Sequence, residues 1–316
     1  MRQNIDQLNL DWKLIIFDEI HKVKGRKSKT SQSLLKIKIP RRYGLTGTLM
    51  QNDFEELWSL IDFIRPGALG TSSEFRRLYG DPIKLGHRKS ATPSEVLHGK
   101  VAATHLSLLL KEIVLRRDKS IIRDLLPGKE DRIVFCPMTQ MQIVAYTNIL
   151  KHPFYKRFFS KKAKVTQLKQ SVFPAIQNLI KIANHIQLLK PKENSKNYEN
   201  QLDLYKAALG EHIKQIETAF VKSPTEVAGK LRVLKKLLAN WFKEEKKVLL
   251  FSYSTEMLDI IENFVTCLDY TWVRIDGKTP IDTRQITIDD FNADRKIFLF
   301  LISTKCGGLG LNLTAA

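Results

Sequence analysis

Cysteines are few in this sequence, and the three present are far apart. Cys136, Cys267 and Cys306 show no paired spacing, which argues against a disulfide framework and against a zinc site. The chain also lacks an apolar run near the ~20 residues that a membrane span needs, and its first twelve residues lack the apolar core of a signal peptide. These absences predict a soluble protein of a reducing, intracellular compartment that does not bind membranes.

Acidic residues are also scarce relative to basic ones. The chain has 33 aspartates and glutamates against 52 lysines and arginines, a formal net charge of +19. Such an excess favours a polyanionic partner such as nucleic acid over a membrane surface, although lysine-rich helix faces are often simply solvated. At 316 residues the chain exceeds what one hydrophobic core usually serves, so two domains are expected.

Short apolar runs predict two separate units with parallel sheets. The first unit has strands at Leu14–Phe17 and Arg42–Leu45, and the second has strands at Lys247–Ser252, Thr271–Ile275 and Lys296–Ser303 with a helix at Thr255–Cys267. Residues 136–240 carry helical periodicity, with apolar faces at Met141–Leu150, Val172–Leu189 and Leu202–Phe220. The polar stretch Lys190–Asn200 predicts a loop or a disordered insert. The class is therefore α/β with helical insertions.

Polar motifs follow the first two strands directly. Asp18–Glu19–Ile20–His21 comes after the first, at the position where a nucleotide hydrolase places one acid to hold Mg²⁺ and another to activate water. Alone, this tetrapeptide also suits a solvated strand end. Thr46–Gly47–Thr48, with Gln51 just beyond, follows the next strand. The pair indicates nucleotide chemistry more specifically than either motif alone.

Two glycine-containing loops in the second unit have different interpretations. The last strand ends at Ser303–Thr304 and continues into Gly307–Gly308, which lets backbone amides approach a phosphate closely, although an ordinary strand-to-helix turn has the same composition. The Gly277–Lys278–Thr279 triplet imitates a Walker A loop. That loop needs a further glycine where this chain has Trp272, so the triplet is excluded as a nucleotide cradle.

Together these motifs resemble the Swi/Snf-type ATPases of helicase superfamily two. The matching segments are DEIH, LTGTLMQNDFEELWSLIDFIRPG, LLKEIVLRRDKS and STKCGGLGLNLTAA, and the resemblance covers nearly the whole chain. The DEIH spelling together with GDPI and ANHIQLL is most similar to the excision-repair cross-complementing branch, group six-like two.

The resemblance implies a fold and an activity. It implies two RecA-like lobes, both incomplete: residues 1–117 form part of the first with a helical protrusion, and 118–131 link the lobes. Residues 132–316 hold the insertion and the second lobe, and the strand-like run Arg132–Phe135 is expected to be the first strand of that lobe. It further implies an ATP- and Mg²⁺-dependent translocase on double-stranded DNA, closing its lobes around the DNA backbone. The enzyme would act in the nucleus in DNA repair or chromatin remodelling, with chromatin or repair proteins as possible partners.

The resemblance also implies residue roles. Asp18 would hold Mg²⁺, Glu19 would activate water, and His21 would link these acids to the coupling residues Thr46, Gly47, Thr48 and Gln51. The paired Arg116 and Arg117 would serve the junction between lobes. The residues expected to contact DNA are Arg274, Arg284, Ser303, Thr304, Gly307 and Gly308. The basic cluster Lys22–Lys29 suits nuclear import, DNA contact or simple solvation.

The sequence departs from the family at both ends. No Walker A loop precedes Asp18, and the chain stops at Ala316 before the family's final arginine box. Since an arginine finger alone contributes ~10³–10⁵ in rate, the polypeptide by itself is expected to hydrolyse almost no ATP. An incomplete gene prediction is the first explanation and a truncated natural isoform the second. The alternatives are a non-catalytic DNA-binding or regulatory fragment and an RNA-directed helicase.

Overall fold

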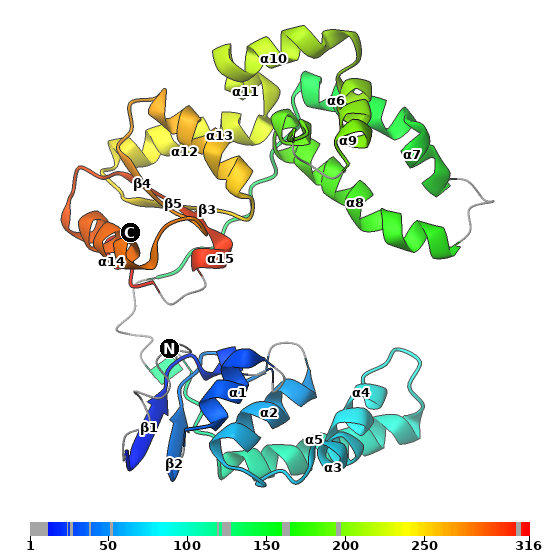
Figure 1. Ribbon diagram of the computed structural model, residues 1–316, viewed down its shortest axis with the longest axis vertical. Coiled ribbons are helices and arrows are strands. Elements are labelled where there is room, and N and C mark those ends of the chain that lie inside the picture. Colours follow the sequence, from blue (N-terminus) through cyan, green and yellow to red (C-terminus); the bar gives the residue numbers. More distant parts are fainter. Residues whose placement is uncertain are drawn as a thin grey trace. The chain divides into compact units, whose positions relative to one another are not determined.

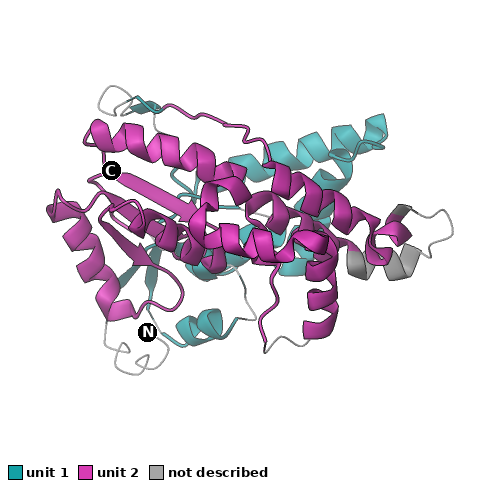
Figure 2. Ribbon diagram, turned by 90° about the horizontal axis from the view of Figure 1, so that it is seen from above, with its two compact units in different colours: residues 1–129 teal, residues 130–316 magenta. Residues whose placement is uncertain are grey.

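The computed structural model divides into two compact units, residues 1–129 and 130–316 (Figure 2). It describes residues 12–23, 25, 28–37, 39–50, 53–118, 120–121, 128–159, 165–193, 197–307 and 311–316. The division falls within the predicted linker 118–131. Because residues 119 and 122–127 lie outside the described ones, the linker role of this segment stays a prediction.

The first unit combines a two-stranded parallel sheet with two groups of helices (Figure 1). Its elements in chain order are β1 (Leu14–Phe17), η3 (Ile20–Val23), α1 (Lys29–Leu35), β2 (Arg41–Gly44), α2 (Phe54–Ile64), α3 (Ser72–Phe75), the π-helix η4 (Arg76–Gly80), α4 (Asp81–Gly86) and α5 (Pro93–Lys111). Leu14 pairs with Arg41 and Phe17 with Gly44, so both strands end at the same edge. One apolar core lies between the sheet, α1 and α2, and a second joins α2 to the α3–α5 hairpin.

The second unit contains a helical region followed by a three-stranded parallel sheet. The helical region consists of α6 (Gln140–Lys151), α7 (Pro153–Lys156), η6 (Arg157–Phe159), α8 (Val165–Asn184), η7 (Ile186–Leu189), α9 (Tyr198–Leu209), η8 (Gly210–His212), α10 (Ile213–Lys222) and α11 (Pro224–Val227). The next helix, α12 (Gly229–Lys243), packs on the sheet. The rest comprises β3 (Val248–Ser252), α13 (Thr255–Thr266), β4 (Trp272–Ile275), α14 (Ile281–Ala293), β5 (Leu299–Ser303) and α15 (Thr304–Gly307). The helical region has its own apolar core.

The sheet of the second unit has the order β3-β5-β4 and is covered on both faces (Figure 1). Leu299 and Leu301 of β5 pack with α12 and α13, whereas Phe300 and Ile302 pack with α14. This alternation follows from the two-residue period of a strand. Parallel strands covered on both faces need continuous apolar runs, which explains why LFLIS is apolar throughout.

The polar side chain of Gln142 joins the helical region to this α/β part. Gln142 is fully buried, and its Nε2 donates to the carbonyls of Ile182 (2.7 Å) and Ala183 (3.1 Å) at the end of α8. Its Oε1 accepts from the N–H of Gly229 at 2.9 Å, where α12 begins. Because a Cβ at Gly229 would lie 1.9 Å from the Pro137 carbonyl oxygen, only glycine permits this approach.

Two sequence expectations were wrong in detail. Arg132–Phe135 forms no strand, and Ile133 and Phe135 are 86% and 92% exposed. Apolar, β-branched composition is not sufficient, because a strand also requires a neighbouring strand, and no described strand pairs with this segment. The predicted loop Lys190–Asn200 is shorter than expected because α9 already begins at Tyr198. Among the described helices, none is both long and apolar enough to cross a bilayer.

Candidate functional site

The DEIH residues lie at the carboxyl edge of the first sheet, where the chain turns sharply. Glu19 has a left-handed backbone with φ of 50°, and its N–H donates to Asp18 Oδ1 at 2.8 Å. The turn is closed by the Ile20 N–H, which donates to the Leu45 carbonyl at 3.0 Å. A left-handed non-glycine residue costs ~1–3 kcal/mol, so the surrounding contacts hold Glu19 in a conformation it would otherwise avoid.

The turn is anchored by Ile20, which is 3% exposed in the core between the sheet and α2. Gly44, the last residue of β2, lies against it, and a Cβ at that position would approach the Ile20 side chain to 3.0–3.1 Å. The absence of a side chain at Gly44 therefore lets the acidic turn pack closely on the second strand.

His21 connects this turn to the Thr46–Gly47–Thr48 segment beyond β2. Its Nδ1 lies 2.9 Å from Thr46 Oγ1 and 3.1 Å from Glu19 Oε2. Thr46 Oγ1 donates to the Thr48 carbonyl at 3.0 Å and accepts from the Thr48 N–H at 3.2 Å. Because the Thr46 hydroxyl already donates its proton to the Thr48 carbonyl, it must accept from His21, so the Nδ1 of His21 carries a hydrogen. The Glu19 carboxylate lies where it can accept from the same N–H. The structure thus brings together Glu19 and His21, which follow β1, and Thr46, which follows β2.

Asp18 is exposed beside this network. A carboxylate oxygen is the ligand type that Mg²⁺ takes, usually with one or two carboxylates, waters and substrate phosphates. In the described part of the chain, no group of three or more His, Cys, Asp or Glu residues is arranged to hold a metal. Asp18 would suit a magnesium ion that takes its other ligands from phosphate oxygens and water.

The second unit presents its glycine loop at the carboxyl edge of its own sheet. Ser303 ends β5 and is 3% exposed, whereas Thr304 and Lys305 are exposed at the start of α15. Lys305 Nζ lies 5.4 Å from the Tyr253 ring centroid, over the loop that follows β3. Gly307 ends α15, and Gly308 lies outside the described residues.

The guanidinium of Arg274 lies among three carboxylates. It contacts Asp259 at 2.7 Å, Asp276 at 2.6 Å and also Glu262, and its side chain is 16% exposed. Burial opposes the charged form, but the hydrogen bonds that the guanidinium donates to these carboxylates raise the pKa of Arg274 above its ordinary value. The predicted DNA contact through Arg274 stays a prediction, and the observed geometry gives its guanidinium a structural set of partners.

Arg284 holds the turn after β4 rather than projecting freely. Its Nε donates to the Thr279 carbonyl at 3.1 Å and its Nη2 to the Asp276 carbonyl at 3.2 Å. Asp276 Oδ1 accepts from the Lys278 N–H at 2.8 Å, closing the same turn. Burial would raise the pKa of Asp276, but this N–H and Arg274 together lower it. The GKT triplet thus lies in a turn that these hydrogen bonds close.

Arg116, Arg117 and Gln51 complete the set of residues predicted for the site. Arg116 and Arg117 are exposed in the extended segment after α5, within the first unit. Gln51 lies outside the described residues. Sequence reasoning missed Asp259 and Glu262, the partners of Arg274. Their spacing of three on the amphipathic helix α13 was the available signal, because residues at i and i+3 share a helix face.

Two family models match the chain in sequence. The SNF2-related domain matches residues 1–188, and the helicase conserved C-terminal domain matches residues 229–316. The chain therefore belongs to the SNF2 family of helicase-like ATPases, as predicted. With the parallel sheets of both units, these matches also confirm the predicted α/β class with two RecA-like lobes.

Curated relatives match almost the whole chain. Switch 2 of Arabidopsis thaliana is 37% identical over 97% of this chain, and DNA excision repair protein ERCC-6-like 2 of Mus musculus is 32% identical over 100%. The chain spans 41% and 22% of their respective lengths. Among solved structures, the Sulfolobus solfataricus SWI2/SNF2 ATPase core in complex with dsDNA is 24% identical, with a TM-score of 0.45. That match covers 100% of this chain and 59% of the other.

Proposed function

We propose that this chain is part of an ATP-hydrolysing motor that tracks along double-stranded DNA in a nuclear protein of DNA repair or chromatin remodelling. Family membership supports ATP use, and a formal net charge of +19 supports a polyanionic track. The name of the mouse relative supports excision repair. The chain alone is proposed to be inactive in ATP hydrolysis, and the activity belongs to the longer protein.

The observation that carries this proposal is the network of Glu19, His21 and Thr46 at one sheet edge. Glu19 acts as the base that removes a proton from water, and Asp18 holds Mg²⁺, which neutralises phosphate charge when bound. His21 shares one N–H between the catalytic carboxylate and Thr46. A change in the charge around Glu19 therefore alters the hydrogen bond to Thr46, and with it the Thr46–Gly47–Thr48 segment.

The DNA backbone is proposed to lie on the second edge, at Ser303, Thr304, Gly307 and Gly308. Hydroxyl and backbone N–H groups contact phosphates without reading bases, so binding would depend on salt and little on sequence. Arg284 supports this surface by fixing the Asp276–Thr279 turn.

A test is Glu19→Gln in the full-length protein. The substitution keeps size and hydrogen bonding but removes the base, so DNA-stimulated ATP hydrolysis should fall by at least ~10²-fold while nucleotide binding remains. Glu112→Gln, an exposed glutamate at the end of α5, is the matched control and should retain the wild-type rate. Hydrolysis is measured with duplex DNA, with RNA and without nucleic acid.

The outcomes separate the alternatives. Wild-type hydrolysis by Glu19→Gln contradicts the assignment of the base. Stimulation by RNA and not by duplex DNA indicates an RNA-directed helicase. A wild-type protein that hydrolyses nothing under any of these conditions indicates a non-catalytic DNA-binding or regulatory protein.

A further inference from the structure

The helical region of the second unit contains a long stretch without acidic residues. Residues 132–192 include eleven lysines and arginines but no aspartate or glutamate. Three of these cations, Arg132, Lys190 and Lys192, pair with acids outside the stretch. The others supply an excess of positive charge, away from the DEIH and glycine-loop edges in sequence. Such a local field attracts a polyanion.

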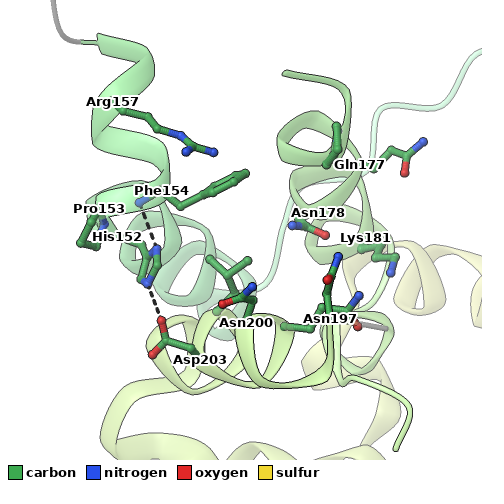
Figure 3. Close-up of a pocket in the computed structure, with 13 residues that line it drawn as sticks. His152, Pro153, Phe154, Arg157, Gln177, Asn178, Lys181, Asn197, Asn200 and Asp203 are labelled. Atoms are coloured by element: carbon green, nitrogen blue, oxygen red, sulfur yellow. Dashed lines mark hydrogen bonds and ion pairs between the residues drawn. The ribbon is translucent and has the colours of Figure 1, made fainter. Parts of the chain in front are cut away.

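A groove with a volume of about 770 Å³ opens within this region (Figure 3). Arg157 of η6 lines one wall, and Gln177 and Lys181 of α8 line another. Asn197 and Asn200 at the start of α9 line the floor. Within the described residues, neither Arg157 nor Lys181 has an acidic partner, so both cations are available to an anion.

The contacts inside the groove orient its charged groups. The Arg157 guanidinium carbon lies 4.1 Å from the Phe154 ring centroid, which holds the planar group against the wall. On the floor, His152 Nδ1 accepts from the Phe154 N–H at 3.2 Å, so Nε2 carries the proton and donates to Asp203 at 3.0 Å. The groove therefore offers cations on its walls and amides with one carboxylate on its floor.

We propose that this groove binds a single-stranded segment of nucleic acid. Phosphates lie on Arg157 and Lys181, and base edges meet Asn197 and Asn200, because amide side chains both donate to and accept from bases. A duplex keeps its Watson–Crick edges paired inside the helix, so only a single strand can present these edges to the floor. An acidic peptide would be repelled by Asp203, whereas a carboxylate accepts from base amino groups. This inference does not depend on the proposed motor activity.

The test measures binding of a labelled single strand of about 12 nucleotides to the purified 316-residue chain by fluorescence anisotropy. Arg157→Gln/Lys181→Gln should weaken binding at least about tenfold and reduce the slope of log K against log salt by about 1.4, for two lost phosphate contacts. Lys206→Gln/Lys222→Gln removes the same charge from exposed positions of α9 and α10 that do not line the groove. That control should change affinity much less.

A second variant separates base contacts from charge. Asn200→Ala should weaken binding about 2–10-fold and leave the salt slope unchanged, since no phosphate contact is lost. Circular dichroism checks that both double variants are folded. The proposal is overturned if Lys206→Gln/Lys222→Gln loses as much affinity as Arg157→Gln/Lys181→Gln. It is also overturned if a duplex of equal length binds the groove as tightly, or if poly-glutamate displaces the strand with the same dependence on Arg157 and Lys181.

Discussion

The two parallel sheets are built from similar apolar runs but bury them differently. All five residues of β5 are buried, whereas in β1 Leu14 and Ile16 are 44% and 57% exposed and Ile15 and Phe17 are half-buried. β5 lies between two strands and beneath helices on both faces, while β1 packs on helices through one face. The stability of the second unit should therefore depend on its sheet, and that of the first mainly on its helices.

The largest expected effect comes from deleting one aromatic ring in each sheet. Phe300 of β5 is fully buried with its ring centroid 5.0 Å from that of Phe291, so Phe300→Ala should lower the free energy of unfolding of the second unit by ~3–5 kcal/mol. Tyr43 of β2 is 57% exposed, so Tyr43→Ala should change the first unit by less than ~1 kcal/mol. Urea titrations followed by hydrogen exchange in each unit give both values. Equal losses would contradict the comparison.

This contrast also shows how much of the fold was predictable. The apolar runs placed all five described strands to within a few residues, because strand periodicity and flanking polar motifs are local signals. Whether a run is covered on both faces depends on the helices that reach it, which is not a local property. The same limit explains Arg132–Phe135, whose composition suits a strand although no described strand pairs with it.

The candidate site was predictable to a similar degree. The order of Asp18, Glu19 and Thr46 after two parallel strands placed them at one edge, as observed. The left-handed backbone of Glu19 and the carboxylates around Arg274 were not predicted. The first results from packing of Ile20 against Gly44, and the second from α13 lying beside β4. Both are tertiary contacts between segments separated in sequence.

Acid should destabilise the second unit before the first. Burial lowers the pKa of His185 to about 4 from an ordinary 6.5, and in the described structure its Nε2 has no hydrogen-bond partner. Between these values the unfolded chain binds a proton that the folded unit does not, so stability falls as the pH drops from 6.5 towards 4. The loss is up to about 3 kcal/mol.

The first unit has groups that respond only at lower pH. Hydrogen bonds from the backbone N–H and hydroxyl of Thr71 lower the pKa of Glu74, and Thr92 does the same for Glu95. The stability from these carboxylates is complete above their ordinary pKa of 4.5 and is lost only as the pH falls below it. Hydrogen exchange of each unit at pH 7 and 5.5 checks the order of loss.

His185→Asn is the control for this prediction. Asparagine can still accept from the Gln187 N–H, as His185 Nδ1 does at 3.2 Å, but it does not titrate. The variant should be less stable at pH 7 because it leaves a cavity beside Phe220, yet its stability should change little between pH 6.5 and 4.5. A pH dependence that persists in this variant would assign the effect to other groups.

The smallest expected effect concerns left-handed residues, which occur in both units for different reasons. Glu245, with φ of 53°, follows the end of α12, and the next N–H, that of Lys246, donates to the Trp241 carbonyl at 3.0 Å, as in an ordinary helix end. Glycine adopts this conformation without the cost of a Cβ, so Glu245→Gly should stabilise the second unit by ~0.5–1 kcal/mol.

Glu19, with φ of 50°, lies instead between two motifs of the candidate site. Glu19→Gly should stabilise the first unit by a smaller amount, since it gains the same relief but loses the 3.1 Å contact with His21. Urea titrations at neutral pH measure both differences, and Glu19→Gln, which keeps the Cβ, should show no gain. If Glu19→Gly destabilises its unit, the His21 contact outweighs the backbone strain, and the turn is a stabilising feature of the first unit.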